Sequence, residues 1–183
     1  MALEATFRGL SICLHQLNDA LNDLQVTLGD KPLDDELAMA DGLEAAVLDV
    51  TGTLFEARKA AVKARKAVGH PPDLDLARRS LTLCQERFHR FERQFGADLV
   101  SYEKLKELVR IGRERKAWLP WANTVKFGID QCRLPLERTS QAIAACWQEL
   151  AERLGTVNLS VQTIGQQIKM PDTTRDREPE RVT

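Results

Sequence analysis

A seven-residue hydrophobic repeat runs along most of this 183-residue chain and constrains its fold more than any other feature. Apolar side chains recur in steps of four and three over residues 3–28, 43–68 and 74–95. This spacing puts one apolar seam along an α-helix, and the seams of several helices must be buried together. The repeat therefore predicts an all-α fold with coiled-coil-like heptad packing.

Breaks in the repeat divide the chain into four long helices. Gly29 and Pro32 end the first, which begins near residue 2, and Gly69 with the two following prolines ends the second, which begins near Asp34. The third is predicted from residue 73 to about 117, with possible disturbance at its two glycines, and the fourth follows the turn at 118–121. Short connections make neighbouring helices antiparallel, so the sequence predicts an up-down-up-down bundle.

Two places in the last third of the chain interrupt this pattern. Pro135 lies inside the fourth helix, where a missing N–H and a crowded ring predict a kink or a break. Residues 156–168 fit a helical seam but also alternate like a strand, and the long helical context favours helix. Part of the third helix, at about 65 Å, is expected to project beyond the first, at about 40 Å, or to pack on something else.

Composition indicates one domain at residues 1–170 followed by a tail. Hydrophobic residues make up 43% of the chain, which suffices for a core, whereas residues 171–183 are charged and nearly without apolar side chains. We expect this tail to be disordered. The sequence shows neither a signal peptide nor an apolar run of membrane-spanning length, so we expect a cytoplasmic protein without an integral membrane span.

The four cysteines have no metal-like or redox-active spacing. Cys13, Cys84, Cys132 and Cys146 include no CxxC pair. Cysteine is a small and readily buried hydrophobe, so reduced core residues are expected.

Charge is distributed unevenly along the chain. Residues 1–50 hold two basic and ten acidic side chains, whereas residues 51–120 hold sixteen basic and nine acidic ones. Two basic clusters lie at 58–66 and 110–116. They are compatible with nucleic-acid binding, but each falls in the last turns of a predicted helix, where cations stabilise the negative end of the helix dipole. We favour this structural interpretation.

Catalytic and metal-binding patterns are weak. Glu86 and His89 form a single Glu-x-x-His pair, whereas the di-iron bundles that use this unit need two pairs and further inward carboxylates. Cys13 and His15 would point about 200° apart on a helix. The sequence therefore predicts no catalytic residue, no metal site, no cofactor and no enzymatic activity.

The turn Trp118-Leu119-Pro120-Trp121 is the candidate partner-binding site. If the third helix projects, both tryptophans and Leu119 would be uncovered, with Arg113 and Arg115 within two turns. Exposed aromatic groups beside arginine are typical of interface hot spots. The alternative is that Trp118 and Trp121 close the end of the bundle core.

These patterns favour a non-enzymatic helical-bundle protein that acts through protein–protein contacts, as an adaptor, scaffold or assembly subunit. Its partner would be another protein or a second copy of the chain. The alternatives are a nucleic-acid-binding accessory protein that uses the basic middle third, and a membrane-active effector that releases its first helix. The acidic polar side of that helix disfavours attraction to anionic lipid.

Overall fold

The computed structural model describes the backbone of residues 2–32 and 38–168, and the side chains of residues 2–32 and 38–155. The chain divides into two compact units, residues 1–150 and residues 151–183. The first unit contains every side chain discussed below. The predicted domain boundary at 170 is not tested by this division and stays a prediction.

Residues 2–32 and 38–168, the described part of the chain, form helices joined by short turns and contain no β-strand. The all-α prediction is therefore confirmed for this part of the chain. The α-helices are α1 (Ala2–Gly29), α2 (Ala38–Ala67), α3 (Leu74–Phe95), α4 (Tyr102–Glu114) and α5 (Leu119–Ile168). A π-helical turn, η1 (Gly96–Val100), follows α3, and a 3₁₀ turn, η2 (Lys116–Trp118), precedes α5.

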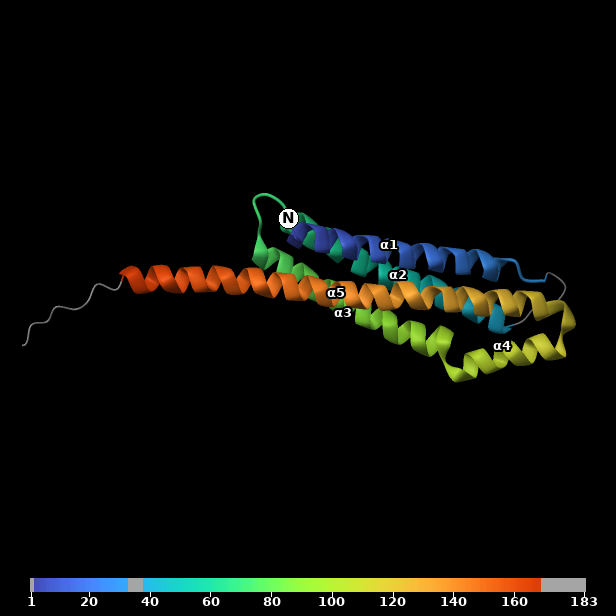
Figure 1. The fold of residues 1–183 in the computed structure, drawn as a ribbon. Coiled ribbons are helices and arrows are strands. Elements are labelled where there is room, and N and C mark those ends of the chain that lie inside the picture. The colour runs from blue at the N-terminus through green and yellow to red at the C-terminus, as the bar shows by residue number, and fades with distance from the viewer. Residues whose placement is uncertain (1, 33–37, 169–183) are drawn as a thin grey trace, which may run out of the picture. The chain divides into compact units, whose positions relative to one another are not determined.

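In the first unit α1, α2, α3 and α5 run side by side, and each runs opposite to the one named before it (Figure 1). The start of α5 meets the end of α1, since the Trp121 indole N–H donates to the Leu28 carbonyl, and later in α5 the Cys146 thiol contacts the Thr6 carbonyl. The Thr53 hydroxyl of α2 donates to Gln94 of α3 at 2.7 Å. These contacts fit an antiparallel helical bundle.

The predicted seams form the core. All eight seam residues of α1 are buried, and several are fully inaccessible, including Phe7, Leu17 and Leu21. Along α5 the buried residues include the polar Thr139, which the hydrophobic pattern does not predict. Its hydroxyl can be buried because it donates to the Pro135 carbonyl at 2.7 Å. Burial of the seams is thus shown, whereas knobs-into-holes geometry between them stays a prediction.

The prediction of one uninterrupted third helix is wrong, whereas the disturbance predicted at Gly96 is confirmed, because η1 begins there. α3 ends at Phe95, and the chain passes through η1 to Ser101, whose ψ of 146° is extended rather than helical. The Ser101 hydroxyl then accepts a hydrogen bond from the Lys104 N–H and caps a new helix, α4. α3 has 22 residues, or about 33 Å, and the rest of the predicted third helix forms η1 and α4, which packs on α5.

The other local predictions have mixed outcomes. α5 is assigned as one helix that contains Pro135, so no break occurs there, and the predicted kink stays untested. Residues 156–168 are helical, as the context favoured. The predicted disordered tail at 171–183 and the predicted start of the second helix near Asp34 lie outside the described residues.

The four cysteines predict a sharp difference in reactivity. Burial raises the pKa of the Cys84 thiol to about 12, and burial is also the main cause that raises the pKa values of Cys132 and Cys146 to about 12. Cys13 is only half-buried. Because the thiolate is the reactive species, iodoacetamide at about pH 8 should modify one thiol in the native protein and four after denaturation. Mass spectrometry would measure this, and rapid native modification of a second thiol would contradict the packing.

Candidate partner-binding surfaces

Both tryptophans of the predicted site lie inside the bundle. Trp118 is 2% exposed and Trp121 is 5% exposed, and their rings meet edge to face with centroids 5.2 Å apart. The expectation that the turn would leave them uncovered is wrong, because both indoles are buried and Trp121 reaches the end of α1 at Leu28. Their burial favours the alternative that they close the end of the core.

Trp121 also completes the end of α1. The last carbonyls of an α-helix have no donor within the helix, and Leu28 lies in this last turn. The Trp121 indole N–H donates to the Leu28 carbonyl across 3.4 Å in a buried environment. One side chain therefore fills the core and satisfies a polar group that water cannot reach.

The other three predicted site residues remain at the surface. Leu119 is 44% exposed, and a Cβ at Gly112 would lie 3.0 Å from its Cδ1, so the glycine allows α4 to approach α5 closely. Leu119 and Arg113 border a small hollow of about 160 Å³ between these two helices. Arg115 is exposed just before η2. The structure thus separates the predicted set into two core residues and three surface residues, and partner binding by the set stays a prediction.

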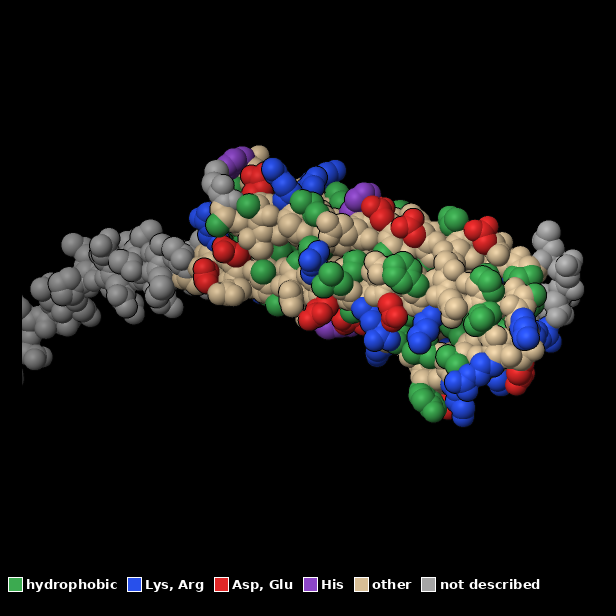
Figure 2. Space-filling view, turned by 45° about the vertical axis from the view of Figure 1, so that its right-hand side comes forward, with side chains coloured by type: hydrophobic (Ala, Val, Ile, Leu, Met, Phe, Trp, Pro, Cys, Tyr) green, Lys and Arg blue, Asp and Glu red, His purple; other side chains and the backbone are tan. Residues whose placement is uncertain are grey.

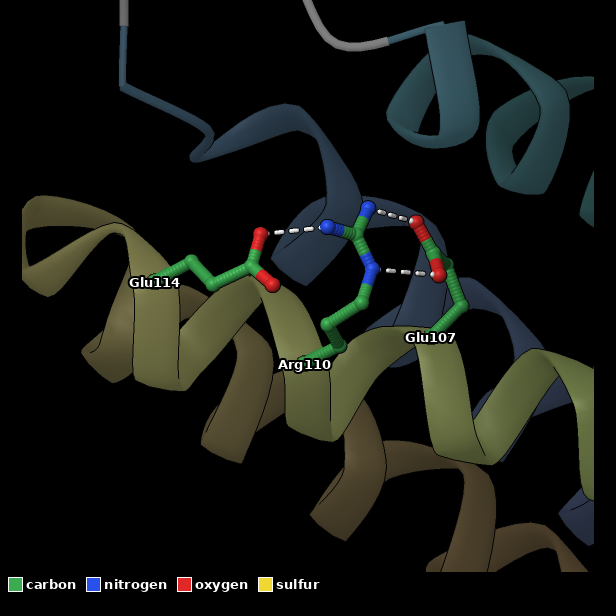
Figure 3. Close-up of polar contacts among 3 residues, drawn as sticks. All are labelled: Glu107, Arg110 and Glu114. Atoms are coloured by element: carbon green, nitrogen blue, oxygen red, sulfur yellow. Dashed lines mark hydrogen bonds and ion pairs between the residues drawn. The ribbon is translucent and has the colours of Figure 1, made fainter.

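One cation of the basic cluster at 110–116, Arg110, is compensated by acids of its own helix, α4. The Arg110 guanidinium lies between Glu107 and Glu114 and donates to both carboxylates, with a 2.9 Å bond from Nε to Glu107 (Figure 3). This hydrogen bonding lowers the pKa of Glu107 and raises that of Arg110. At the lower right of Figure 2, several Lys and Arg side chains lie together with a few acidic ones. The cluster offers a phosphate backbone less positive charge than its sequence suggests.

The Glu-x-x-His pair lies on an exposed face of α3. The His89 ring contacts Glu92 through Nδ1 at 2.9 Å and Gln85 through Nε2 at 3.4 Å. Among the described residues no group of three or more His, Cys, Asp or Glu side chains is arranged to hold a metal ion.

None of the described helices combines the length and the apolar character that a membrane span requires.

The outward face of α2 carries a second apolar repeat that the sequence analysis missed. Leu48, Phe55 and Val62 are seven residues apart and are 56%, 53% and 40% exposed. Ala45 precedes Leu48 and Gly52 lies between Leu48 and Phe55, in the same steps of four and three, and both are also exposed. Among the described residues no chain segment covers these side chains. We call Ala45, Leu48, Gly52, Phe55, Lys59 and Val62 the outer seam.

The two ends of the outer seam have opposite charge. Asp41, Glu44 and Asp49 lie along the first half of α2, whereas the second half carries a cluster of cations. This cluster comprises Arg58, Lys59, Lys63, Arg65 and Lys66. The Lys59 ammonium lies 5.6 Å from the Phe55 ring centroid and 3.5 Å from Glu56. The helix therefore presents an apolar strip that runs from an acidic to a basic end.

A hollow of about 440 Å³ lies in the basic half of the outer seam. Phe55 and Val62 form its apolar part, and Lys59, Lys63 and Lys66 border it. Its dimensions suit side chains of an approaching helix, which would bury apolar surface that is now in contact with water.

A second groove lies between α1 and α5 and has a volume of about 530 Å³. Phe127, which is 63% exposed, is its large apolar side chain, and Asp19 and Asp23 line the opposite wall. α1 and α5 approach closely at Gly128, where a Cβ would lie 2.9 Å from Leu24 Cδ1. This groove lacks the repeated apolar spacing of the outer seam and serves below as the rival surface.

Replacement of Trp121 by alanine tests its role in the core. Trp121→Ala should lower the free energy of unfolding by about 3–5 kcal/mol, because it leaves a cavity and an unpaired Leu28 carbonyl. Leu119→Ala, a matched change at the half-exposed neighbour, should cost less than about 1 kcal/mol. Urea unfolding of both variants would measure the difference. Equal small effects would show that Trp121 is not a core residue.

Comparison with known proteins identifies no relative of this chain. No protein-family model matches the sequence, and no curated protein and no solved structure shows significant similarity to it. Its function must therefore be inferred from its own residues.

Proposed function

We propose that this chain is a non-enzymatic assembly protein, an adaptor, scaffold or structural subunit, that binds a helix of a protein partner on the outer seam of α2. The observation that carries this proposal is the exposure of Leu48, Phe55 and Val62 at seven-residue spacing. Single exposed apolar residues are ordinary on protein surfaces, but three in heptad register form a continuous strip. The strip matches the anchor spacing by which one helix docks on another.

The energetics favour docking at this strip over the predicted turn. Trp118 and Trp121 are already buried, so a partner gains nothing by covering them. The outer seam instead offers two large aliphatic side chains and one aromatic ring, which are 40–56% exposed. Covering the exposed part of each releases about half of the ~1.5–3 kcal/mol that full burial is worth. The cations beside Phe55 add specificity and speed association rather than supplying most of the affinity.

Nucleic-acid binding is a second candidate, because Arg58, Lys59, Lys63 and Lys66 gather on one side of α2. Two features weaken it. Phe55 and Val62 interrupt the basic surface, and the first half of the same helix is acidic, so that a phosphate backbone that follows the helix axis would meet both signs of charge.

Introduction of a charge in the middle of the seam tests the proposed function. Phe55→Glu should abolish self-association or capture of a protein partner from the native host's extract, while the free energy of unfolding changes by less than about 1 kcal/mol. Phe127→Glu, on the rival groove, is the matched control and should bind like the original protein. Retained binding in Phe55→Glu, or loss only in Phe127→Glu, would contradict the proposal.

Salt dependence separates the two candidates. If the cations of α2 serve the helix end and a protein interface, affinity for duplex DNA or RNA should be weak and vanish near 150 mM salt, about the physiological concentration. Electrophoretic mobility shifts over a salt series would measure it. Tight binding at about 150 mM salt that is lost in Lys63→Glu with Arg65→Glu would support the nucleic-acid alternative.

A further inference from the structure

The charge pattern of α2 specifies the partner for which its outer seam is best suited. The first half of the helix is acidic and the second half is basic, on the same side of the helix as the apolar strip. A surface of this kind is complementary to itself when it is turned end for end. On the basis of the proposed function, we infer that the outer seam pairs with the outer seam of a second copy, with the two α2 helices antiparallel.

A register follows from the spacing of the seam. Antiparallel helices pair when seam positions of one lie opposite seam positions of the other around a two-fold axis. An axis between Gly52 and Phe55 brings each glycine opposite the partner's Phe55. Ala45 then lies opposite the partner's Val62. In both layers a small residue faces a large one, which lets the helices approach closely without overpacking.

The hollow in the basic half fits this register. Leu48 would lie opposite the partner's Lys59 and would enter the hollow beside the partner's Phe55 and Val62. Leu48 is the most exposed large side chain of the seam, at 56%, and pairing would remove it from water. Each two-fold interface contains this contact twice.

Electrostatics select the antiparallel orientation over the parallel one. In the antiparallel register Asp41 lies opposite the partner's Lys66, and Glu44 lies near the partner's Arg65. Lys31 of the same chain contacts both acids, at 2.7 Å and 3.4 Å, and the Asp41 side chain remains 68% exposed to a partner. A parallel pair would instead bring acid onto acid at one end and base onto base at the other. One like-charged approach remains near the centre, between Asp49 and the partner's Glu56. It is moderated because Lys59 of the same chain lies 3.5 Å from Glu56.

Cysteine crosslinking tests both the pairing and its direction. The chain would carry Cys13→Ser, which removes the one native thiol that is not fully buried, together with either Ala45→Cys or Val62→Cys. Neither variant alone should form a disulfide-linked dimer, because equivalent positions lie far apart in an antiparallel pair. An oxidised mixture of the two should form the 45–62 crosslink in high yield. The Cys13→Ser chain without either added thiol is the background control.

Charge variants measured by sedimentation equilibrium supply an independent readout. Asp41→Lys and Lys66→Asp should each weaken the dimer, by about tenfold, because each replaces two attractive end contacts by repulsive ones. The chain with both substitutions should recover the original affinity. An equimolar mixture of the two single variants should form the heterodimer preferentially over either homodimer.

The outcomes separate this inference from the proposed function. A 45–45 crosslink in the Ala45→Cys variant alone would overturn the antiparallel arrangement. A purified chain that stays monomeric up to about 100 µM, together with Phe55-dependent capture of another protein, would overturn self-pairing and leave the proposed function standing. A monomeric chain whose partner capture is insensitive to Phe55→Glu would overturn both.

Discussion

Burial of the leucine-rich seam of α1 is the interaction on which the rest of the first unit depends. Its eight apolar residues lose nearly all contact with water, at about 1.5–3 kcal/mol for each large side chain. α2 and α5 both contribute to this cover. The close approach at Gly128 places Leu24 against the α5 backbone, and Trp121 closes the far end at Leu28. With α1 enclosed in this way, α2 is held with one face inward and the other toward solvent.

The two faces of α2 explain why the helix is a candidate for assembly. Its inner seam includes the small residues Ala57, Ala61 and Ala64, which are buried and allow neighbouring helices to pack closely. The outer seam has larger side chains at Leu48 and Phe55 that nothing in the described chain covers. A helix with apolar strips on two sides is stabilised fully only when both are covered. The bundle supplies cover for the first, and in the proposed assembly a partner would supply it for the second.

The cations at the end of α2 serve two purposes. They favourably meet the negative end of the helix dipole, as the sequence analysis proposed. They also give the two ends of the outward face opposite charges. Asp41 and Glu44 lie at its start, and Lys63 and Lys66 lie near its end. On α4, by contrast, Glu107 and Glu114 flank Arg110, so the positive charge there is used within the helix itself (Figure 3).

The sequence alone determined the helical class, the core seams of α1 and α2 and the helical continuation through 156–168, because seven-residue periodicity is local and survives any arrangement of the helices. The spacing of Leu48, Phe55 and Val62 also indicates a second repeat on α2. It lies on a different face of the helix from the buried repeat. The sequence also indicated a disturbance near Gly96, but only the tertiary structure showed that a new helix, capped by Ser101, begins there. The burial of Trp118 and Trp121 was likewise decided by the tertiary structure, in which Trp121 reaches Leu28 at the end of α1. Exposure depends on which elements pack together, and that is a property of the whole chain rather than of any segment.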